Sequence, residues 1–431
     1  MPDLTSQLLP KLKSHRTGEL PVDDDMILPY YDGLSLVNIP GTISRLFDAP
    51  GFGKPPLDQS LLDAIGGPYE KVILLLVDAM GKNLFDRMLQ THAMSVWNKY
   101  REQAVYATLT SICPSTTASA LTTLWTGEGP SVHGIIGYEM WAKEFGMIIN
   151  NISHSAASAN GDIGGLARSG FDPHAFIQKP LLGTHLREND VQTTAFIQAR
   201  IANSGLSVMQ LEDVHVRTYI DEADLGVNLA DYVNQRPGIR EYIYVYYSDV
   251  DTLMHRYSAE DVRVSLQFET FSNVFEKAFF DRVSPTIVKD ALFILTADHG
   301  SIATDRNPRY DLALHPSLMD CLVMKPTCEN RLAFLYIKPG KQGTVREYFA
   351  RTWPDKFFLV EPQIALENGL FGKGPFREHV LDRMGDLIAV ARRDAYLWWA
   401  PKPNLMAGRH GGLSEEEMLV PFYALPLGAI S

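Results

Sequence analysis

Residues 71–81 read KVILLLVDAMG. After Lys71, every residue up to Val77 is apolar, and the run lacks the alternation that marks a half-exposed strand. A continuous apolar run of this length predicts a strand covered on both faces, as in the parallel sheet of an α/β fold. Asp78 directly follows the run, and a helix-like segment begins at Gly81. The stretch therefore predicts the opening strand, loop and helix of a large α/β domain.

The same order of residues occurs twice more along the chain. Residues 241–251 read EYIYVYYSDVD and residues 291–300 read ALFILTADHG, so each apolar run ends in acidic residues. Because the loops that follow parallel strands meet at the carboxyl edge of the sheet, ligands bind there. We therefore expect polar residues from these distant segments to share one site.

Several residues in these loops and near the C-terminus have side chains that bind metals in proteins. The candidates are Asp78, Asp251, His255, Asp298, His299 and His410. Asp251 and His255 are four residues apart, so a helix would place them on one face. Each candidate alone is a weak signal, since an isolated Asp after a strand is more often a helix cap. Together, three carboxylates and three imidazoles form a ligand set that suits zinc.

The same segments resemble the alkaline phosphatase superfamily, and within it the nucleotide pyrophosphatase/phosphodiesterase branch. The resemblance is carried by ILLLVDAMG, by CPSTTASALTTLWTGEGPSVHGIIGY at residues 113–138, by the DxxxH and DHG elements and by a late HG. It implies an α/β fold with a largely parallel central sheet, helices on both faces and inserted smaller elements. It also implies that one metal is held by Asp251, His255 and His410, and the other by Asp78, Asp298, His299 and the Thr117 oxygen.

The nucleophile is placed by one spacing. Counting back nine residues from Thr126 and Gly127 leads to Thr117, with Thr116 as its close competitor. The resemblance implies attack by the Thr117 hydroxyl and a phosphothreonine intermediate, on a centre of two divalent ions, Zn²⁺ or else Mn²⁺. Two such ions carry four positive charges, which three carboxylates and one alkoxide would balance.

The substrate class stays open at this stage. The phosphodiesterase branch has an Asn three residues after the nucleophile, where this chain has Ala120. A phosphodiester or nucleotide pyrophosphate is the expected substrate, and a phosphonate, as for phosphonoacetate hydrolase, or a phosphomonoester is the alternative. A non-catalytic, metal-stabilised binding protein is the alternative from another class. Arg409 is interpreted either as a phosphate contact or as a structural residue, and His133 as structural.

The expected domain organisation follows from these segments. We expect an irregular or helical extension at residues 1–70 and a catalytic α/β core at residues 71–320, interrupted by an insertion at about 140–240. Residues 321–400 are expected to form an inserted, cap-like region, and residues 401–431 to return to the core.

Composition narrows the partners and the location. Lys and Arg total 39 and Asp and Glu total 51, which gives a net charge of −12, and no long basic run occurs. We therefore expect a small phosphate ester as the partner rather than polymeric nucleic acid.

Three cysteines are too few for a disulfide framework. The first residues lack the apolar stretch of a signal peptide, and no apolar run is long enough to cross a membrane, so we expect a cytoplasmic protein. A homo-oligomer is neither indicated nor excluded.

Overall fold

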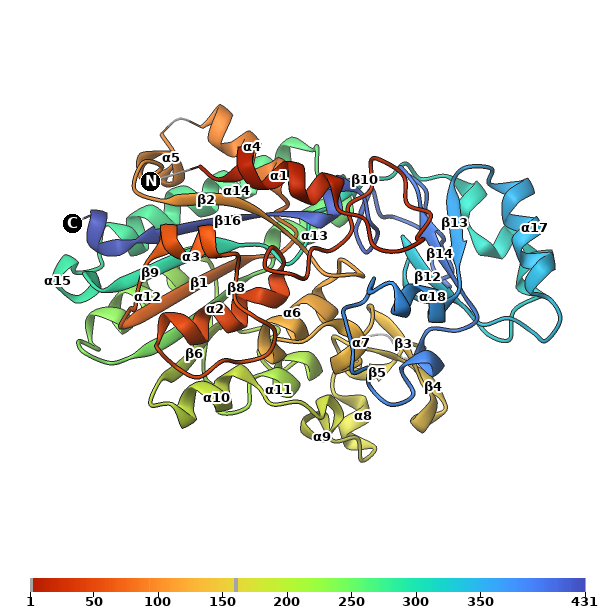
Figure 1. Ribbon diagram of the computed structural model, residues 1–431, viewed down its shortest axis with the longest axis horizontal. Coiled ribbons are helices and arrows are strands. Elements are labelled where there is room, and N and C mark those ends of the chain that lie inside the picture. Colours follow the sequence, from red (N-terminus) through yellow and green to blue (C-terminus); the bar gives the residue numbers. More distant parts are fainter. Residues whose placement is uncertain (1–2, 93, 159–161, 431) are drawn as a thin grey trace.

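The computed structural model describes residues 3–92, 94–158 and 162–430. Two sheets lie one after the other along the long axis of the molecule (Figure 1). Both termini lie at the end that is remote from the second sheet (Figure 1). In the part of the chain that is described, no helix is both long enough and apolar enough to span a bilayer.

The larger sheet has seven strands in the order β2-β16-β9-β1-β8-β6-β7. They are β1 (Lys71–Val77), β2 (Val105–Thr110), β6 (Gln192–Gln198), β7 (His215–Tyr219), β8 (Glu241–Tyr247), β9 (Ala291–Thr296) and β16 (Leu419–Pro426). β1 pairs in parallel with β8 and β9, and β6 pairs in parallel with β7 and β8. β16 runs antiparallel between β2 and β9. The prediction of a largely parallel central sheet is confirmed.

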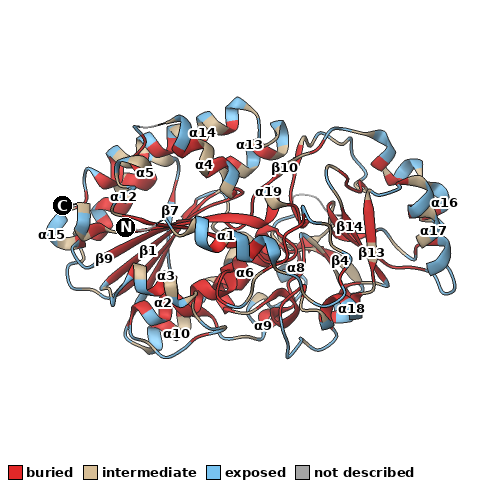
Figure 2. Ribbon diagram, turned by 45° about the horizontal axis from the view of Figure 1, so that its top comes forward, coloured by how far each residue is buried: buried red, intermediate tan, exposed pale blue. Residues whose placement is uncertain are grey.

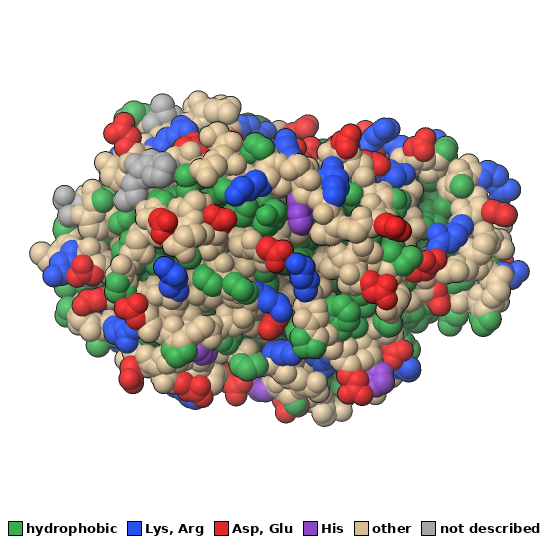
Figure 3. Space-filling model, viewed as in Figure 1, with side chains coloured by type: hydrophobic (Ala, Val, Ile, Leu, Met, Phe, Trp, Pro, Cys, Tyr) green, Lys and Arg blue, Asp and Glu red, His purple; other side chains and the backbone are tan. Residues whose placement is uncertain are grey.

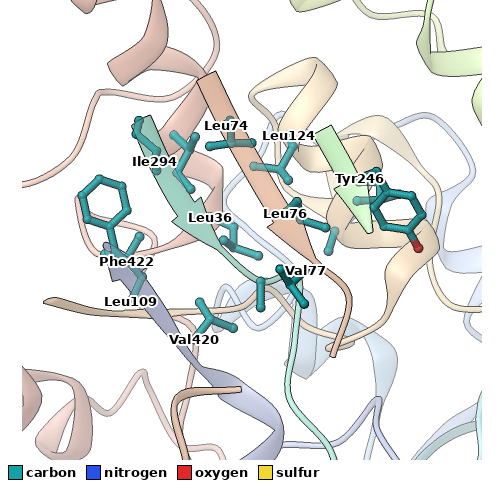
Figure 4. Close-up of a cluster of buried hydrophobic side chains, with 14 of the residues drawn as sticks. Leu36, Leu74, Leu76, Val77, Leu109, Leu124, Tyr246, Ile294, Val420 and Phe422 are labelled. Carbon is teal, nitrogen blue, oxygen red and sulfur yellow. The ribbon is translucent and has the colours of Figure 1, made fainter. Parts of the chain in front are cut away.

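Helices on both faces of this sheet explain the apolar character of its strands. Every residue from Val72 to Val77 is fully buried. Leu74 and Leu76 of β1 lie in a cluster of buried apolar side chains that includes Ile294 of the neighbouring β9 and Leu124 of α6 (Figure 4). One face is covered by α4 (Lys82–Thr91), α12 (Glu222–Asn234), α13 (Asp249–Tyr257) and α14 (Val262–Phe275). The other face is covered by α2 (Ile39–Leu46), α3 (Gln59–Ile65), α6 (Thr117–Thr126), α10 (Leu182–Glu188) and α11 (Gly205–Gln210).

The remaining helices are mostly short, and apart from the buried α7 they expose part of their surface (Figure 2). They are α1 (Thr5–Ser14), α5 (Val96–Lys99), α7 (Pro130–His133), α8 (Gly165–Arg168), α9 (Pro173–Ile177), α15 (Pro285–Val288), α16 (Pro316–Met319), α17 (Gln342–Thr352), α18 (Pro362–Glu367) and α19 (Glu415–Met418).

The second sheet is antiparallel and joins two distant parts of the chain. Its order is β13-β14-β12-β11-β3-β4-β5. Its strands are β3 (Glu139–Ala142), β4 (Met147–Asn150), β5 (Ser155–Ala156), β11 (Thr327–Glu329), β12 (Leu332–Leu335), β13 (Phe357–Val360) and β14 (Leu387–Ala391). β6 and β7 fall within residues 140–240 and are strands of the larger sheet. The domain boundaries drawn from the sequence remain a proposal.

The carboxyl edge of the larger sheet faces the second sheet. β1, β8 and β9 run in register and end together at Val77, Tyr247 and Thr296. Near this edge a two-stranded sheet forms between β10 (Ile302–Ala303) and β15 (Gly408–Arg409). Loops from both halves of the chain thus meet where ligands bind in open parallel sheets.

Candidate active site

All seven predicted site residues lie together at this edge, each just beyond a strand. Asp78 follows β1, Thr117 opens α6 after β2, Asp251 and His255 lie on α13 after β8, Asp298 and His299 follow β9, and His410 follows β15. Asp78, Thr117, Asp298, His299 and His410 are buried, whereas Asp251 and His255 are partly exposed.

The loops after β1 and β9 are in close contact because two glycines face each other. A Cβ atom added to Gly300 would lie 2.9 Å from the Cα of Gly81 and 2.0 Å from a backbone oxygen of Glu416. The backbone at Ala79 is left-handed, with φ of 59°, which is uncommon for a residue with a Cβ. In this conformation the Ala79 N–H donates to Asp298 Oδ1 at 3.1 Å, so a hydrogen bond joins the two acidic loops and helps to hold the strained backbone.

His299 lies at the centre of one group of candidate ligands. Its Nε2 atom is 3.5 Å from Asp78 Oδ1, 3.4 Å from Asp298 Oδ2 and 3.2 Å from the Thr117 hydroxyl oxygen. Ligands bonded at about 2.0–2.1 Å to a tetrahedral zinc ion are separated by about 3.3 Å. These separations therefore have the size that one shared metal ion requires.

Asp251 lies at the centre of a neighbouring group. Its Oδ1 atom is 3.4 Å from His255 Nε2 and 4.0 Å from His410 Nε2. Asp251, His299 and His410 also present ligand atoms within 4.8 Å of one another, and the rings of His299 and His410 stack with centroids 3.9 Å apart. The two groups thus adjoin at His299, and the assignment of ligands to two separate ions remains a prediction.

The three histidines present the same ring nitrogen to the site. In each ring Nδ1 lies near a backbone carbonyl oxygen, as in many metal sites where an outer partner fixes the tautomer. The pairs are His255 with Gly408 at 3.1 Å, His299 with Gly300 at 3.0 Å and His410 with Ser115 at 3.0 Å. With the proton on Nδ1, each Nε2 lone pair is available to a cation.

Three carboxylate oxygens in the site are buried without a hydrogen-bond partner among the described residues: Asp78 Oδ1, Asp251 Oδ1 and Asp298 Oδ2. The other oxygens of Asp78 and Asp298 are satisfied, by the Tyr246 hydroxyl and by backbone N–H groups of Ala79 and His299. A buried unpaired carboxylate oxygen is costly unless a cation compensates it. The donor set therefore fits divalent cations of the zinc class.

The electrostatics of the two groups agree with this fit. Burial raises the pKa of Asp78 well above its ordinary value, and the carboxylates of Asp298 and Asp251 raise it further. Burial lowers the pKa of His410 well below its ordinary value, and His299 and His255 lower it further. Bound cations would offset the repulsion among the carboxylates. They would also bind the imidazoles in the neutral form that burial favours.

Comparison with known proteins places the chain in a family. Residues 72–413 match the family described as type I phosphodiesterase/nucleotide pyrophosphatase. The chain belongs to this family. It is therefore a phosphoric ester hydrolase of a metal-dependent family. No curated protein sequence matches the chain.

Several solved structures with a similar fold align with most of the chain. Murine ectonucleotide pyrophosphatase/phosphodiesterase 5 has a TM-score of 0.60 at 14% identity, covering 82% of this chain and 88% of its own. An inactive threonine-to-alanine variant of that protein, in complex with AMP, has a TM-score of 0.59, again at 14% identity, with 82% and 87% covered. Phosphonoacetate hydrolase from Sinorhizobium meliloti, in complex with phosphonoformate, has a TM-score of 0.56 at 16% identity, with 82% and 89% covered. At these identities the likeness shows the shared fold.

The two threonines that compete for the role of nucleophile differ in their contacts. The Thr117 hydroxyl lies 3.2 Å from His299 Nε2, inside the family's predicted metal centre. The Thr116 hydroxyl instead donates to Glu329 Oε1 at 2.6 Å, on the side of the second sheet. Thr117 is therefore the better placed of the two.

Two other residues considered from the sequence have structural contacts. The Arg409 guanidinium donates to Thr304 and to Asn404 Oδ1, and it stacks 3.7 Å above the ring of Tyr396. His133 is buried, and its Nε2 lies 3.1 Å from the Thr123 hydroxyl oxygen. Both side chains therefore make their contacts outside the candidate metal centre.

A cavity of about 260 Å³ opens beside Thr117, Asp78 and Asp251. Its walls are largely aliphatic and aromatic; they include Leu121, Trp125, Ile152, Ile197, Ile201, Leu206, Leu211 and Tyr244. The Tyr244 hydroxyl is buried and has no hydrogen-bond partner among the described residues. Sequence reasoning missed this cavity, although Tyr242, Tyr244 and Tyr246 alternate along β8 and so share one face of the sheet.

A buried ion pair holds the loop that carries His410. Glu417 accepts from Arg331 through both carboxylate oxygens, at 3.0 and 2.7 Å, and from the backbone N–H groups of Gly412 and Ser414. Burial by itself would raise the pKa of Glu417, but Arg331 and these hydrogen bonds outweigh it and hold the pKa below its ordinary value. The pair thus connects the turn between β11 and β12 of the second sheet to the residues that follow His410.

Replacing Arg331 by Met is expected to lower the free energy of unfolding by about 3–5 kcal/mol, because Glu417 would remain buried without its partner. Urea denaturation of the purified protein measures this. The matched control is Arg282→Met, which removes an exposed arginine paired with Asp231 at 3.5 Å and should cost less than about 1 kcal/mol. Equal losses in the two variants would contradict the structural role given to the buried pair.

Proposed function

We propose that this protein is a two-metal phosphodiesterase, acting on phosphodiesters or nucleotide pyrophosphates, with Thr117 as its nucleophile. One observation carries the proposal. The Thr117 hydroxyl lies beside His299 Nε2, in a site that also brings together His255, His410 and three buried carboxylate oxygens that lack a partner among the described residues. Zinc fits this ligand set best, and manganese is the alternative. That a threonine-to-alanine variant of the murine relative is described as inactive agrees with this role.

The chain's own residues account for the reaction as follows. When bound, divalent ions held by the three carboxylates and three imidazoles would lower the pKa of the Thr117 hydroxyl and stabilise the negative charge that develops in the reaction. The Thr117 oxygen attacks phosphorus as the bond to the leaving group breaks, which gives a phosphothreonine. Backbone N–H groups at the start of α6 face the same region and can bind a non-bridging oxygen. Water then cleaves the phosphothreonine and restores the hydroxyl.

A phosphodiester fits the site better than a phosphomonoester. A monoesterase needs a cationic side chain for the additional charge, and Arg409 is committed to Thr304, Asn404 and Tyr396. Arg200, at the rim of the cavity, is paired with Asp249. Phosphonate cleavage remains the second candidate, because phosphonoacetate hydrolase shares the fold.

One substrate panel tests the proposal. The metal-free protein should be inactive, and added zinc or manganese should restore turnover of methyl 4-nitrophenyl phosphate. The same preparation is then compared on a nucleotide pyrophosphate, 4-nitrophenyl phosphate, phosphonoacetate and a sulfate ester. Faster cleavage of phosphonoacetate than of any diester would replace the proposal by a phosphonatase, and a lack of metal-dependent turnover would reject it.

The cavity beside Thr117 is proposed to accommodate one ester group of the substrate. An apolar cavity of about 150 Å³ holds benzene, so a volume of about 260 Å³ has room for a substituted aromatic ring or a short chain. The unpaired Tyr244 hydroxyl could donate to an acceptor on that group. The substrate would then be a diester with one largely apolar ester group that carries a hydrogen-bond acceptor.

Replacing Ile201 by Trp should fill part of this cavity. We expect kcat/KM for phenyl 4-nitrophenyl phosphate to fall about tenfold or more, since one steric change in an apolar pocket has effects of this size. Turnover of the methyl analogue should stay within about threefold. The control is Ile220→Trp, a change at an exposed position. If both diesters were affected equally, the cavity would not be the ester subsite.

We propose that the enzyme is cytoplasmic, which cell fractionation tests. We also propose that its partner is a small phosphate ester. On the face shown in Figure 3, acidic and basic side chains are interspersed, without a continuous basic tract for polymeric nucleic acid. All three cysteines are buried and free.

A further inference from the structure

Glu329 lies where the second sheet contacts the start of α6, the helix that begins with Thr117. It ends β11, and its Oε1 atom accepts from the Thr116 hydroxyl at 2.6 Å and from the Tyr138 N–H at 2.9 Å. A Cβ atom added to Gly411 would lie 2.5 Å from the Cβ of Glu329. The side chain is therefore flanked by the residue before Thr117 and by the residue after His410.

The second carboxylate oxygen of Glu329 has no hydrogen bond among the described residues. Within the same residues, no Lys, Arg or His forms a salt bridge with Glu329. Burial raises the pKa of Glu329 to about 8; hydrogen bonds from Thr116 and Tyr138 oppose this shift, whereas the carboxylates of Glu139 and Asp251 add to it. Glu329 is thus an acidic group without a cationic partner, beside a site that binds anions.

The net charge of the metal centre determines how strongly a nearby acidic side chain such as Glu329 affects the binding of anions. Two divalent ions, three carboxylates and the Thr117 alkoxide would sum to zero, so additional charges nearby decide which anion binds best. A phosphate monoester carries two negative charges at alkaline pH, because its second pKa is about 6, whereas a diester carries one. An acid next to Thr116 repels the monoester more strongly than the diester.

We propose that Glu329 is a specificity-determining residue whose carboxylate, in its ionised form, disfavours doubly charged phosphate monoesters relative to singly charged diesters. The inference rests on the proposed phosphodiesterase function. It adds a residue outside the metal centre, from the second sheet, that sets the charge of the accepted substrate.

The variant Glu329→Gln isolates the charge. The amide oxygen of glutamine can still accept from Thr116 and Tyr138, and the amide nitrogen takes the place of the oxygen that lacks a partner. The control Glu139→Gln removes one negative charge from the neighbouring strand β3, where Glu139 accepts from the Trp399 indole N–H at 2.9 Å. Unchanged thermal unfolding of both variants would show that the fold is kept.

Kinetics at pH 9, above the pKa of Glu329, use two substrates with the same leaving group: 4-nitrophenyl phosphate and its methyl diester. In metal-loaded Glu329→Gln, kcat/KM for the monoester should rise about tenfold, while that for the diester stays within about threefold. Calorimetry should show that inorganic phosphate binds to Glu329→Gln about tenfold more tightly than to the wild-type protein. Glu139→Gln should show neither effect.

Three results would overturn the inference: an unchanged ratio of monoester to diester turnover, a parallel loss of both activities, or the same shift in Glu139→Gln. If the unchanged enzyme cleaves no diester, the proposed function fails instead. In that case the calorimetric affinity for inorganic phosphate still decides the inference, because tighter binding by Glu329→Gln supports the charge effect and equal binding rejects it.

Discussion

Thr117→Ala is expected to lower kcat by about 1,000-fold or more, with both metal ions still bound. Removal of a nucleophile has effects of this order because the covalent step is lost. Metal binding should persist, since the three carboxylates and three imidazoles are unchanged. The measurement is steady-state turnover of methyl 4-nitrophenyl phosphate, together with the metal content of the same sample.

Two companion variants make this result specific. Thr117→Ser keeps a hydroxyl near His299 Nε2 and should retain measurable turnover. Thr116→Ala removes the hydroxyl that donates to Glu329, and should affect kcat far less than Thr117→Ala. Mass spectrometry of acid-quenched enzyme should find the phosphoryl group on Thr117. Full activity in Thr117→Ala, or a phosphoryl group on Thr116, would reassign the nucleophile.

The larger sheet could be predicted from the sequence because its signal is local. An apolar run such as residues 72–77 can be stable only where both of its faces are covered, and the helices on the two faces supply that cover. The acidic residues after the strands could be predicted to meet for a related reason, since parallel strands end at one edge. The expectation thus depended on local pattern and on the geometry of parallel sheets.

The second sheet could not be predicted in the same way. β3 and β11 pair at only one position, Glu139 with Cys328, and these residues lie far apart in sequence. Pairing between distant short strands leaves no periodic signal within either segment. For the same reason Glu329 was not among the candidate residues, because nothing in its local sequence indicates contact with Thr116.

Arg409 illustrates a different limit. Its position beside His410 suggested a phosphate contact, but side chains that are adjacent in sequence need not point the same way, and Arg409 ends β15 whereas His410 follows it. β15 directs Arg409 towards Thr304 and Tyr396, while His410 faces Asp251. Sequence adjacency therefore predicted proximity of the backbone and not the direction of the side chain.

Asp298→Asn is expected to abolish metal-dependent turnover, with a loss of about 1,000-fold or more, because a bound metal supplies several kcal/mol of transition-state stabilisation. The amide oxygen can still accept from the backbone N–H groups of Ala79 and His299, as Oδ1 does now. The amide nitrogen replaces Oδ2, which lacks a hydrogen-bond partner and lies 3.4 Å from His299 Nε2. The loss is thus confined to one ligand and one charge, and unfolding measurements should show a folded protein.

Metal analysis of this variant also tests how the ligands are divided. If Asp78, Asp298 and His299 hold one ion, Asp298→Asn should bind one zinc per chain instead of two, and His255→Ala should lose the other ion. Anomalous diffraction at the zinc edge would show which position remains in each variant. Because Asp251, His299 and His410 also form a compact group, His299 could instead belong to the ion bound by Asp251. Loss of the same ion from both variants, or two ions retained in Asp298→Asn, would contradict the proposed division.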